Sequence, residues 1–483
     1  MNGLNDASFS SLSNKLIKPN YDRTQVDVGI VHLGPGAFHR AHQAYFTDKA
    51  LEQGGHWGIC GVSLNSPSVK NALSPQDGLY TLAIQEQQNQ YQLIGALKEV
   101  LHLEQDRSKV MQRLLSESTK IVTLTITEKG YCTDGNGVLD LTNSAIKHDI
   151  AYPDKPSSAI GLLVNAISAR RQQCIQPLLV ISCDNVTENG RKLQSAIMQF
   201  CQAINNDDLA AYIQDHVEFP CTMVDSITPA TDDDLRENIV DELGYHDAWP
   251  IKREAFAQWV IETTSATDLP AWDKAGVVFT PDIEAFENAK LRLLNLPHSS
   301  LAYMGTLLGL VTVSDAMKHV KLKNFVCDLV NQEVIPSIAA PDGLNLQNYR
   351  DEILNRFRNP SIHHHLEQIA QDGSQKLQMR LIPIIKANLQ EGRSINKLCI
   401  VLASWFKFII NKIEQGDSLV DPIESTLKEV VTNNVDDLPS MLEGFLSIGT
   451  LFEDDIYNNR QFNSAIKEAY TNVMTKGVAV TIN

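Results

Sequence analysis

The chain has 483 residues, of which 43% are hydrophobic and 20% are charged, a composition typical of a soluble globular protein. Its formal net charge of −17 argues against a duplex nucleic acid or an anionic membrane as a partner. Residues 1–20 contain no apolar signal core, and no apolar run is long enough to cross a membrane, so we expect a soluble, cytoplasmic protein. The eight cysteines are scattered without a CxxC pair, which favours buried free thiols in a reducing compartment.

The first strong strand signal, the apolar run 26–33, leads into a glycine turn and then into a helical stretch at 41–51. In this setting glycines let backbone amides approach a pyrophosphate at the positive end of the helix. His39 replaces the third glycine of the usual fingerprint, and Arg40 could supply a phosphate contact instead. The sequence therefore predicts these cofactor-binding residues in the turn: Gly34, Gly36, Ala37, Phe38 and Arg40.

A second strand at 57–64 ends where a dinucleotide fold usually carries an acid for the adenosine ribose. Asn65 and Ser66 occupy this position, and no Asp or Glu follows them closely. Asn65 could donate a hydrogen bond to a ribose hydroxyl, whereas the sequence has no arginine cluster here that could bind a 2′-phosphate. The pattern favours NAD(H) as cofactor and leaves NADP(H) open.

Three further apolar runs predict strands of a parallel sheet: 91–97, 121–127 and 177–183. A helical pattern at 159–173 lies between the last two, and strands alternating with helices indicate α/β architecture. Polar residues follow the carboxyl ends of strands, where open α/β sheets bind ligands. Asn185 is a candidate there, although Asp184 or Asn185 could equally cap the next helix.

The pattern of the sequence changes near Pro281. Before it, a strand at 219–227 carries Asp225, a residue that in such a place is more often structural than catalytic. Because 483 residues exceed what one core usually serves, we expect an α/β domain over 1–282 and a mainly α-helical domain over 283–483. Helical patterns dominate the second part: 283–296, 298–318, 320–334, 346–357, 362–371, 376–389, 395–415 and 421–431.

A mostly apolar helical run opens the second domain. On an ideal α-helix Lys290, His298 and Asn295 fall at about 0°, 80° and 140°, so all three can border one concave site. Glu287 lies one turn before the lysine, close enough to touch it. Pro297 predicts a kink or a new helix start just before His298. By itself the run fits an amphipathic surface helix better than a catalytic one.

Two later features carry charged or metal-binding residue types. Lys376 and Arg380 lie four residues apart and could hold a substrate hydroxyl or carboxylate, or else form one solvated face. The adjacent histidines His363-His364-His365 would point ~100° apart on a helix and cannot chelate one ion together. The sequence predicts no metal site.

These segments together resemble the mannitol dehydrogenase family of polyol-specific long-chain dehydrogenases. The resemblance implies a Rossmann-type dinucleotide-binding amino-terminal domain, a mainly α-helical carboxy-terminal domain and a zinc-independent site between them. Its substrate would be a small sugar acid or polyol. The matching segments follow the family's order: 32–43, 182–185, 222–225, 290–298 and 372–376.

The family pattern implies catalytic roles for four residues. Lys290 would be the acid/base, and Glu287 matches an acid thought to gate proton traffic to it. Asn185 and Asn295 would orient and polarise the reacting oxygen, as amide donors that stabilise a developing alkoxide. Burial suits the lysine because desolvation disfavours its charged form.

The family pattern also implies substrate contacts. His298 would bind the substrate, and Asp225 and Lys376 match polar positions around it. Arg380, one helical turn beyond Lys376, is our additional candidate on the same face.

Within the family, three segments look most like fructuronate reductases, which are D-mannonate oxidoreductases: 127–132, 157–161 and 219–225. We therefore expect an NAD-dependent secondary-alcohol dehydrogenase that interconverts D-mannonate and D-fructuronate. Ser226 departs from the family's Val-Asp-Arg motif, and His363 and His365 stand where those reductases are arginine-rich. The alternatives are a mannitol 2-dehydrogenase, another polyol or ketose oxidoreductase, or a tagaturonate-type reductase. A catalytically inactive, ligand-binding member is less compatible with the intact Lys290 and Asn295.

Overall fold

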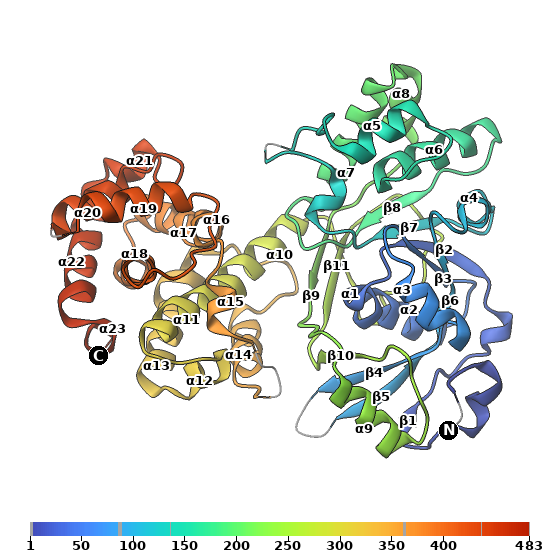
Figure 1. Cartoon of the computed structure of the whole chain (residues 1–483), viewed down its shortest axis with the longest axis horizontal. Coiled ribbons are helices and arrows are strands. Elements are labelled where there is room, and N and C mark those ends of the chain that lie inside the picture. The colour runs from blue at the N-terminus through green and yellow to red at the C-terminus, as the bar shows by residue number, and fades with distance from the viewer. Residues whose placement is uncertain (1–2, 86–88, 136, 361–363, 436, 483) are drawn as a thin grey trace. The chain divides into compact units, whose positions relative to one another are not determined.

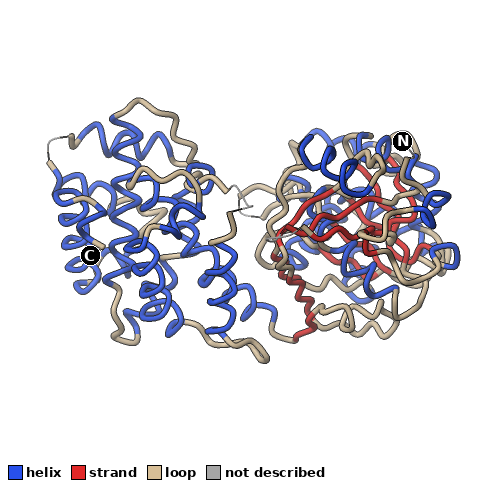
Figure 2. The backbone as a smooth tube through the Cα atoms, turned by 90° about the horizontal axis from the view of Figure 1, so that it is seen from below, coloured by secondary structure: helices blue, strands red, loops and turns tan. Residues whose placement is uncertain are grey.

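The computed structural model describes residues 3–85, 89–135, 137–360, 364–435 and 437–482. The chain divides into two compact units, Met1–Glu284 and Ala285–Asn483. The strands belong to the first unit, and the described residues of the second form helices and loops (Figure 2). This division lies close to the change of pattern expected at residue 283.

A five-stranded parallel sheet forms the centre of the first unit (Figure 1). The chain adds strands on one side of β2 and then starts again on its other side with β7, which is the doubly wound order of a Rossmann fold. The α/β fold class is thereby confirmed, with its switch point between β2 and β7. The strands, in their order across the sheet, are β6 (Leu97–His102), β3 (Gly58–Ser63), β2 (Val28–Leu33), β7 (Ile121–Leu124) and β8 (Leu179–Ser182).

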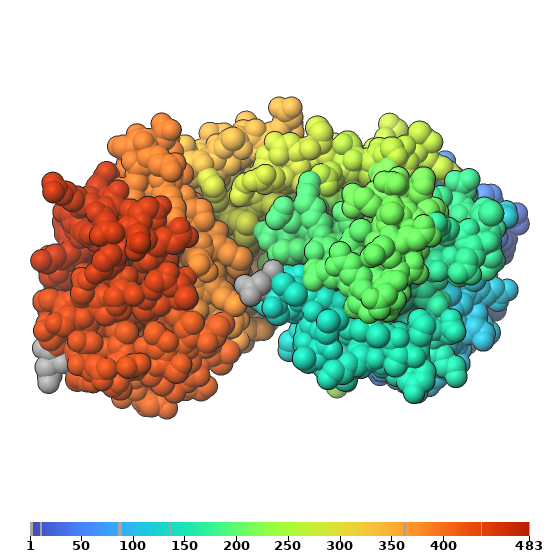
Figure 3. Space-filling view, turned by 90° about the horizontal axis from the view of Figure 1, so that it is seen from above, coloured from blue at the N-terminus to red at the C-terminus, as the bar shows by residue number. Residues whose placement is uncertain are grey.

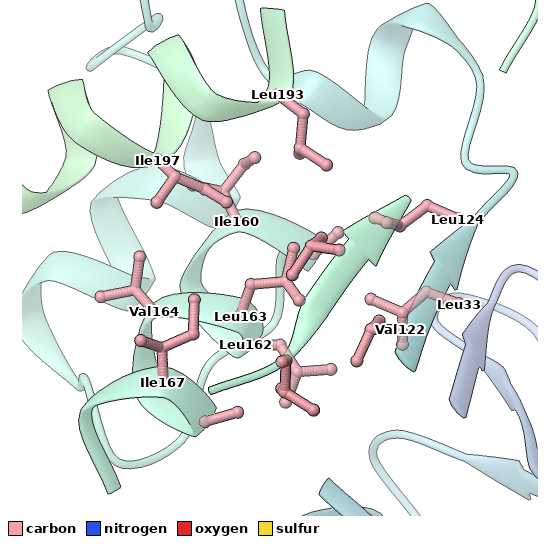
Figure 4. Close-up of a cluster of buried hydrophobic side chains, with 14 of the residues drawn as sticks. Leu33, Val122, Leu124, Ile160, Leu162, Leu163, Val164, Ile167, Leu193 and Ile197 are labelled. Atoms are coloured by element: carbon pink, nitrogen blue, oxygen red, sulfur yellow. The ribbon is translucent and has the colours of Figure 1, made fainter. Parts of the chain in front are cut away.

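Helices α6 (Ala159–Gln172) and α7 (Asn189–Ala203) supply apolar side chains to the core around β7 and β8. Buried strands and helices share an apolar cluster in which each fully buried aliphatic side chain contributes about 1.5–3 kcal/mol. Figure 3 looks onto the outer surface on this side, formed by residues of α5 (Ser144–Ala151) to α8 (Asp207–His216) in teal and green. The cluster members labelled in Figure 4 are Leu33, Val122, Leu124, Ile160, Leu162, Leu163, Val164, Ile167, Leu193 and Ile197.

Two smaller sheets complete the strands of the first unit, with orders β1-β5-β4-β10 and β12-β11-β9. The prediction that 91–97 belongs to the parallel sheet is wrong. The run is divided between two sheets, because β5 ends at Ile94 and only Leu97 belongs to β6, which joins the parallel sheet. Between the two strands the backbone N–H of Gly95 donates to Asp48 Oδ1 at 2.8 Å. The strands are β1 (Leu16–Ile17), β4 (Tyr80–Gln85), β5 (Gln90–Ile94), β9 (Thr222–Asp225), β10 (Ile251–Glu254), β11 (Gln258–Glu262) and β12 (Val278–Thr280).

The helix after the glycine turn begins earlier than expected and is interrupted. It consists of α1 (Ala37–Ala41) and α2 (Gln43–Leu51), with His42 between them at φ −125° and ψ −84°. Polar residue types at the start hid α1 in the sequence, although His39 and Arg40 are fully buried. The remaining helices of this unit are α3 (Ser68–Leu73), α4 (Arg107–Leu114) and α9 (Asp233–Leu243).

In the second unit α18 (Asn396–Glu414) packs against α11 (Leu296–Leu307) and α22 (Arg460–Lys476). The sequence did not locate the last four helices, and the expected helix at 362–371 lies partly outside the described residues. None of the helices in the described part of the chain is long and apolar enough to cross a membrane. The other helices are α10 (Ile283–Lys290), α12 (Val313–Lys318), α13 (Val320–Leu329), α14 (Leu346–Phe357), α15 (Leu366–Ile369), α16 (Gly373–Arg380), α17 (Ile382–Gln390), α19 (Glu424–Asn433), α20 (Leu438–Leu446), α21 (Asp454–Tyr457) and α23 (Val478–Thr481).

Two helices of the second unit widen into π turns, at Leu291–Asn295 and at Val330–Val334. Each π turn ends two residues before a proline, Pro297 or Pro336. A proline inside an α-helix lacks the N–H of an i→i−4 bond, and its ring collides with the carbonyl four residues earlier. A wider turn, with i→i+5 bonds such as that from Leu296 N–H to the Leu291 carbonyl, accommodates the proline while the chain stays helical.

Candidate active site

The glycine turn after β2 contains two glycines that are required for different reasons. Gly34 has φ +88°, and a Cβ there would lie 2.3 Å from the Thr125 carbonyl oxygen, so the fold itself requires a glycine. Gly36 has an ordinary φ of −73°, and a Cβ there would meet nothing closer than 3.8 Å. The bare backbone of Gly36 therefore leaves room for a ligand, which is what a pyrophosphate needs for close approach.

Two pockets open around this turn at the carboxyl ends of the parallel strands. One has a volume of about 450 Å³ and is lined by Gly34, Asn65 and Ser66 among others. The other, of about 490 Å³, is lined by residues that include Ala37, Phe38 and Asn185. Both include Gly36, Thr125 and Thr127 in their walls. Two adjoining pockets at the switch point, with an open backbone between them, fit the two halves of a dinucleotide.

Arg40 does not take part in these pockets, contrary to the expectation that it binds phosphate. Its side chain is fully buried, and Nη1 donates to the Trp249 carbonyl at 2.8 Å. The guanidinium also lies over the rings of Tyr80 and Trp249, at 5.5 and 5.0 Å from their centroids. A side chain without exposed surface cannot reach a bound phosphate, so Arg40 has a packing role.

His39, at the third position of the fingerprint, stacks on His32 with the ring centroids 3.4 Å apart. Both rings are fully buried, and neither nitrogen of His39 has a hydrogen-bond partner in the structure. Burial lowers the pKa of His32 to about 3 and holds the pKa of His39 well below its ordinary value, with His32, Arg40 and His42 adding to the shift. The stack is therefore neutral at pH 7.

Asn185 and Asp225, two candidates of the first unit, stand at the ends of β8 and β9. Asn189 connects these strands, because its Nδ2 donates to the Asp184 carbonyl at 2.9 Å and its Oδ1 accepts the Thr222 N–H at 2.9 Å. Asp225 is only 6% exposed. These hydrogen bonds fix the end of β8 against the start of β9, three residues before Asp225.

Lys290, the candidate acid/base, is the last residue of α10, and the π turn follows it directly. Lys290 is 8% exposed, and Glu287 one turn earlier is 9% exposed. The 140° separation expected for Lys290 and Asn295 assumed an α-helix. Because a π turn takes more residues than an α turn, Asn295 falls about one turn after Lys290 and closer to its side of the helix than 140° implies. The interruption that Pro297 predicts before His298 is thus present as a π turn.

His298 is surrounded by positive groups. Its ring stacks on Phe357 at 5.2 Å and meets the edge of His364 at 4.7 Å. Burial, and then His364, Arg380, Arg356 and Lys376 in decreasing order, hold the pKa of His298 well below its ordinary value. His298 is therefore neutral at pH 7, with one ring nitrogen able to donate and the other able to accept a hydrogen bond.

The two candidates of α16 belong to the same neighbourhood. Arg380 Nη1 donates to Ser299 Oγ at 2.9 Å and approaches the Asn295 carbonyl at 3.4 Å. Lys376 Nζ donates to the Ile369 carbonyl at 3.1 Å. Burial lowers the pKa of both side chains, and for Lys376 the positive charge of Arg380 adds to the shift. We call His298, Arg356, Lys376 and Arg380 the cation cluster.

Sequence reasoning missed Arg356 and His364. Arg356 lies in an ordinary amphipathic helix and is 9% exposed, so its position depends on tertiary packing that no local pattern reveals. The run that contains His364 predicts surface or pocket histidines rather than metal ligands, but nothing in the sequence places His364 beside His298. The described residues contain no group of three or more potential metal ligands.

Two of the departures from the family pattern, Ser226 and His365, lie in the described part of the chain. Ser226 Oγ donates to the Phe256 carbonyl at 3.0 Å. His365 precedes α15, and His363 lies outside the described residues.

Two family models match the chain. The mannitol dehydrogenase Rossmann domain covers residues 28–274, and the mannitol dehydrogenase C-terminal domain covers residues 282–474. The D-mannonate oxidoreductase of Escherichia coli (strain K12) is 39% identical over 95% of this chain and 96% of its own length. The mannitol 2-dehydrogenase of Pyricularia oryzae is 32% identical, with 99% of this chain and 97% of the relative covered.

Solved structures with the same fold cover the whole chain. The Pseudomonas fluorescens mannitol 2-dehydrogenase, in ternary complex with NAD and D-mannitol, has a TM-score of 0.81 and 33% identity over 100% of this chain and 99% of its own. A substrate-free D-sorbitol dehydrogenase has a TM-score of 0.90 and 29% identity, with 100% of both chains covered.

Proposed function

Since this chain belongs to the mannitol dehydrogenase family, we propose that it is an NAD(H)-dependent fructuronate reductase, interconverting D-mannonate and D-fructuronate. The general activity, that of an oxidoreductase of this family, follows from the membership itself. The choice of a sugar acid as substrate is the new part of the proposal. It draws on the 39% identity to a D-mannonate oxidoreductase over nearly the full chain.

The cation cluster is the observation that carries the choice of substrate. Three cationic side chains act on the neutral His298, and one of them, Arg380, also approaches the Asn295 carbonyl, in a chain whose formal charge is −17. Of the acids that act on Lys376, Asp421 already accepts hydrogen bonds from the backbone and hydroxyl of Ser374. Asp372 is the other acid that acts on Lys376 and offsets part of the positive charge. A histidine with several cationic side chains around it still suits a carboxylate, which an uncharged polyol lacks.

We assign the proton transfer to Lys290 and the binding of the reacting oxygen to Asn295 and Asn185. In ketone reduction Lys290 donates a proton to the carbonyl oxygen, and in alcohol oxidation it removes the hydroxyl proton. The amides of Asn295 and Asn185 donate hydrogen bonds to that oxygen as negative charge develops on it. Glu287, one helical turn from Lys290, would relay the proton to water. His298 binds a substrate hydroxyl, and Asp225 is a further polar contact.

The cofactor is assigned to the two pockets of the first unit. Gly34, Gly36, Ala37 and Phe38 would lie along its pyrophosphate and nicotinamide half, and Asn65 beside its adenosine ribose. A bound nicotinamide supplies or accepts the hydride. The absence of an arginine group at the end of β3 favours NAD(H) over NADP(H).

A mannitol 2-dehydrogenase, or another polyol, ketose or tagaturonate-type oxidoreductase, is the second candidate. Ser226 supports it, since the arginine of the family motif is missing, and so does the 32% identity to a mannitol 2-dehydrogenase.

The test is a substrate screen with the purified enzyme. D-Fructuronate, D-tagaturonate and D-fructose are offered with NADH and with NADPH, and D-mannonate and D-mannitol with NAD and NADP. We expect the largest kcat/KM for the D-fructuronate and D-mannonate pair with the non-phosphorylated cofactor. A larger kcat/KM for fructose than for either uronate would reject the sugar-acid assignment.

A further inference from the structure

Thr127, at the end of β7, has a backbone conformation that β-branched residues almost never adopt. Its φ of 63° and ψ of 166° fall in a region populated essentially by glycine. The residue is exposed and lines both pockets of the first unit. Strain of this kind persists only where neighbouring groups hold it, and it gathers at ligand sites.

The group that holds Thr127 is the carboxylate of Asp184, which is 7% exposed. Asp184 Oδ1 accepts the Thr127 N–H at 2.7 Å, and Oδ2 accepts the Tyr131 hydroxyl at 3.0 Å. The same hydroxyl is hydrogen-bonded to Ser182 Oγ. Both ends of the segment 127–131 are therefore fixed to the end of β8.

We propose that Asp184 is a positioning residue for the dinucleotide: it holds Thr127 in its strained conformation so that the two pockets stay open to one ligand. A Thr127 that relaxed to negative φ would re-aim its peptide and its side chain, which border both pockets. Asp184 thus acts on the cofactor through Thr127. The inference rests on the proposed use of NAD(H), although not on the identity of the sugar.

Asp247 provides a matched control in the same unit. It is 2% exposed, and its carboxylate accepts the backbone N–H groups of Thr81 at 2.6 Å and of Trp249 at 3.0 Å. It lines neither pocket. Loss of a buried carboxylate that binds backbone amides should destabilise the fold in either case, but only the loss of Asp184 should weaken cofactor binding.

The test is a double-mutant cycle read by NADH fluorescence titration, with thermal unfolding of each unliganded variant. Asp184→Ala should raise the Kd for NADH by about tenfold or more, because the strain at Thr127 is no longer held. Thr127→Gly removes the strain itself, so it should bind within about threefold of wild type, both alone and combined with Asp184→Ala. Asp184→Asn keeps an oxygen acceptor for the Thr127 N–H and should bind like wild type.

The outcomes separate positioning from simple destabilisation. Asp247→Ala should lower the unfolding temperature while leaving the Kd for NADH unchanged. Additive losses in the double variant, or wild-type binding by Asp184→Ala, would overturn the proposal. If Asp184→Ala does not fold, the same cycle is run with Asp184→Ser, whose hydroxyl cannot reach both partners. A wild-type chain that binds NADH but reduces no uronate would refute the proposed substrate and leave this proposal standing.

Discussion

The candidate site residues of the two units are of different chemical kinds. The first unit offers mainly backbone and short side chains at the ends of strands, such as Gly36 and Thr127, with the carboxylates of Glu128 and Asp184 nearby and Lys129 in the wall of one pocket. The second offers long side chains from helices, and its charged groups around His298 are cationic. Under the proposed function, the first unit would bind the cofactor mainly through its backbone, and the second would act through charge and proton transfer. Variants in one unit should therefore change a different step from variants in the other.

The largest expected effect comes from Lys290→Ala. Loss of the acid/base should lower kcat by about 10²–10⁴-fold, because proton transfer to the reacting oxygen is lost. The Kd for NADH, measured by fluorescence titration, should stay at the wild-type value because the pockets of the first unit are untouched. Full turnover in this variant would contradict the assigned mechanism.

Arg380→Met tests whether the second unit recognises the charge of the substrate. A hydrogen bond to a charged group contributes about 1.5–3 kcal/mol, so kcat/KM for D-fructuronate should fall by about 10–100-fold. The value for D-fructose should change much less, since it carries no carboxylate. Arg292→Met is the control: this arginine lies in the π turn of the same unit, is also partly buried and is bound to the Ser337 carbonyl. Equal losses for the two sugars would reject a carboxylate contact by Arg380.

The stability of the first unit should depend on pH because of the stacked histidines His32 and His39. The folded pKa values of His32 and His39 lie below the ordinary 6.5, so the unfolded chain binds protons more readily. Their stabilising effect is complete above pH 6.5 and is lost as the pH falls towards about 3, the folded pKa of His32. At pH 5 each such histidine should cost about 2 kcal/mol of unfolding free energy.

His39→Phe tests this pH dependence, since it keeps a ring in the stack and removes the titrating group. Urea unfolding at pH 7 and at pH 5 should give a difference in free energy that is smaller than in wild type by about 2 kcal/mol. An identical pH dependence in wild type and His39→Phe would show that the stacked histidines do not cause it.

The two glycines of the turn give the smallest expected effect and separate folding from binding. Gly36→Ala has room for its methyl group in the unliganded protein, so its unfolding temperature should not change. Its Kd for NADH should rise by about tenfold, or about 1.4 kcal/mol. Gly34→Ala should instead lower the unfolding temperature, because of its φ of +88° and the Thr125 carbonyl 2.3 Å from the new Cβ. Normal NADH binding by Gly36→Ala would argue against a phosphate at this turn.

The sequence was sufficient to predict the α/β fold, the helical second part and the glycine turn, because each depends on local patterns. It failed where tertiary structure decides. The run 91–97 looks like one strand but supplies two sheets, and Arg40 has a polar residue type yet is enclosed by the core. No local signal marks a threonine that will be held at φ 63°, since the cause lies in Asp184, 57 residues away along the chain. The cation cluster likewise combines residues from separate helices.

The π turn after Lys290 accommodates one residue more than an α-helix would hold between Lys290 and Pro297. Deleting one residue from Leu291–Asn295 would close the wide turn into an ordinary α-helix, in which four residues span about the turn that five span here. The helix after the deletion would therefore keep nearly the same face towards Lys290. Pro297 would then lie inside an α-helix, where its ring collides with the carbonyl four residues earlier. We expect such a deletion to lower stability more than it changes which side chains face Lys290.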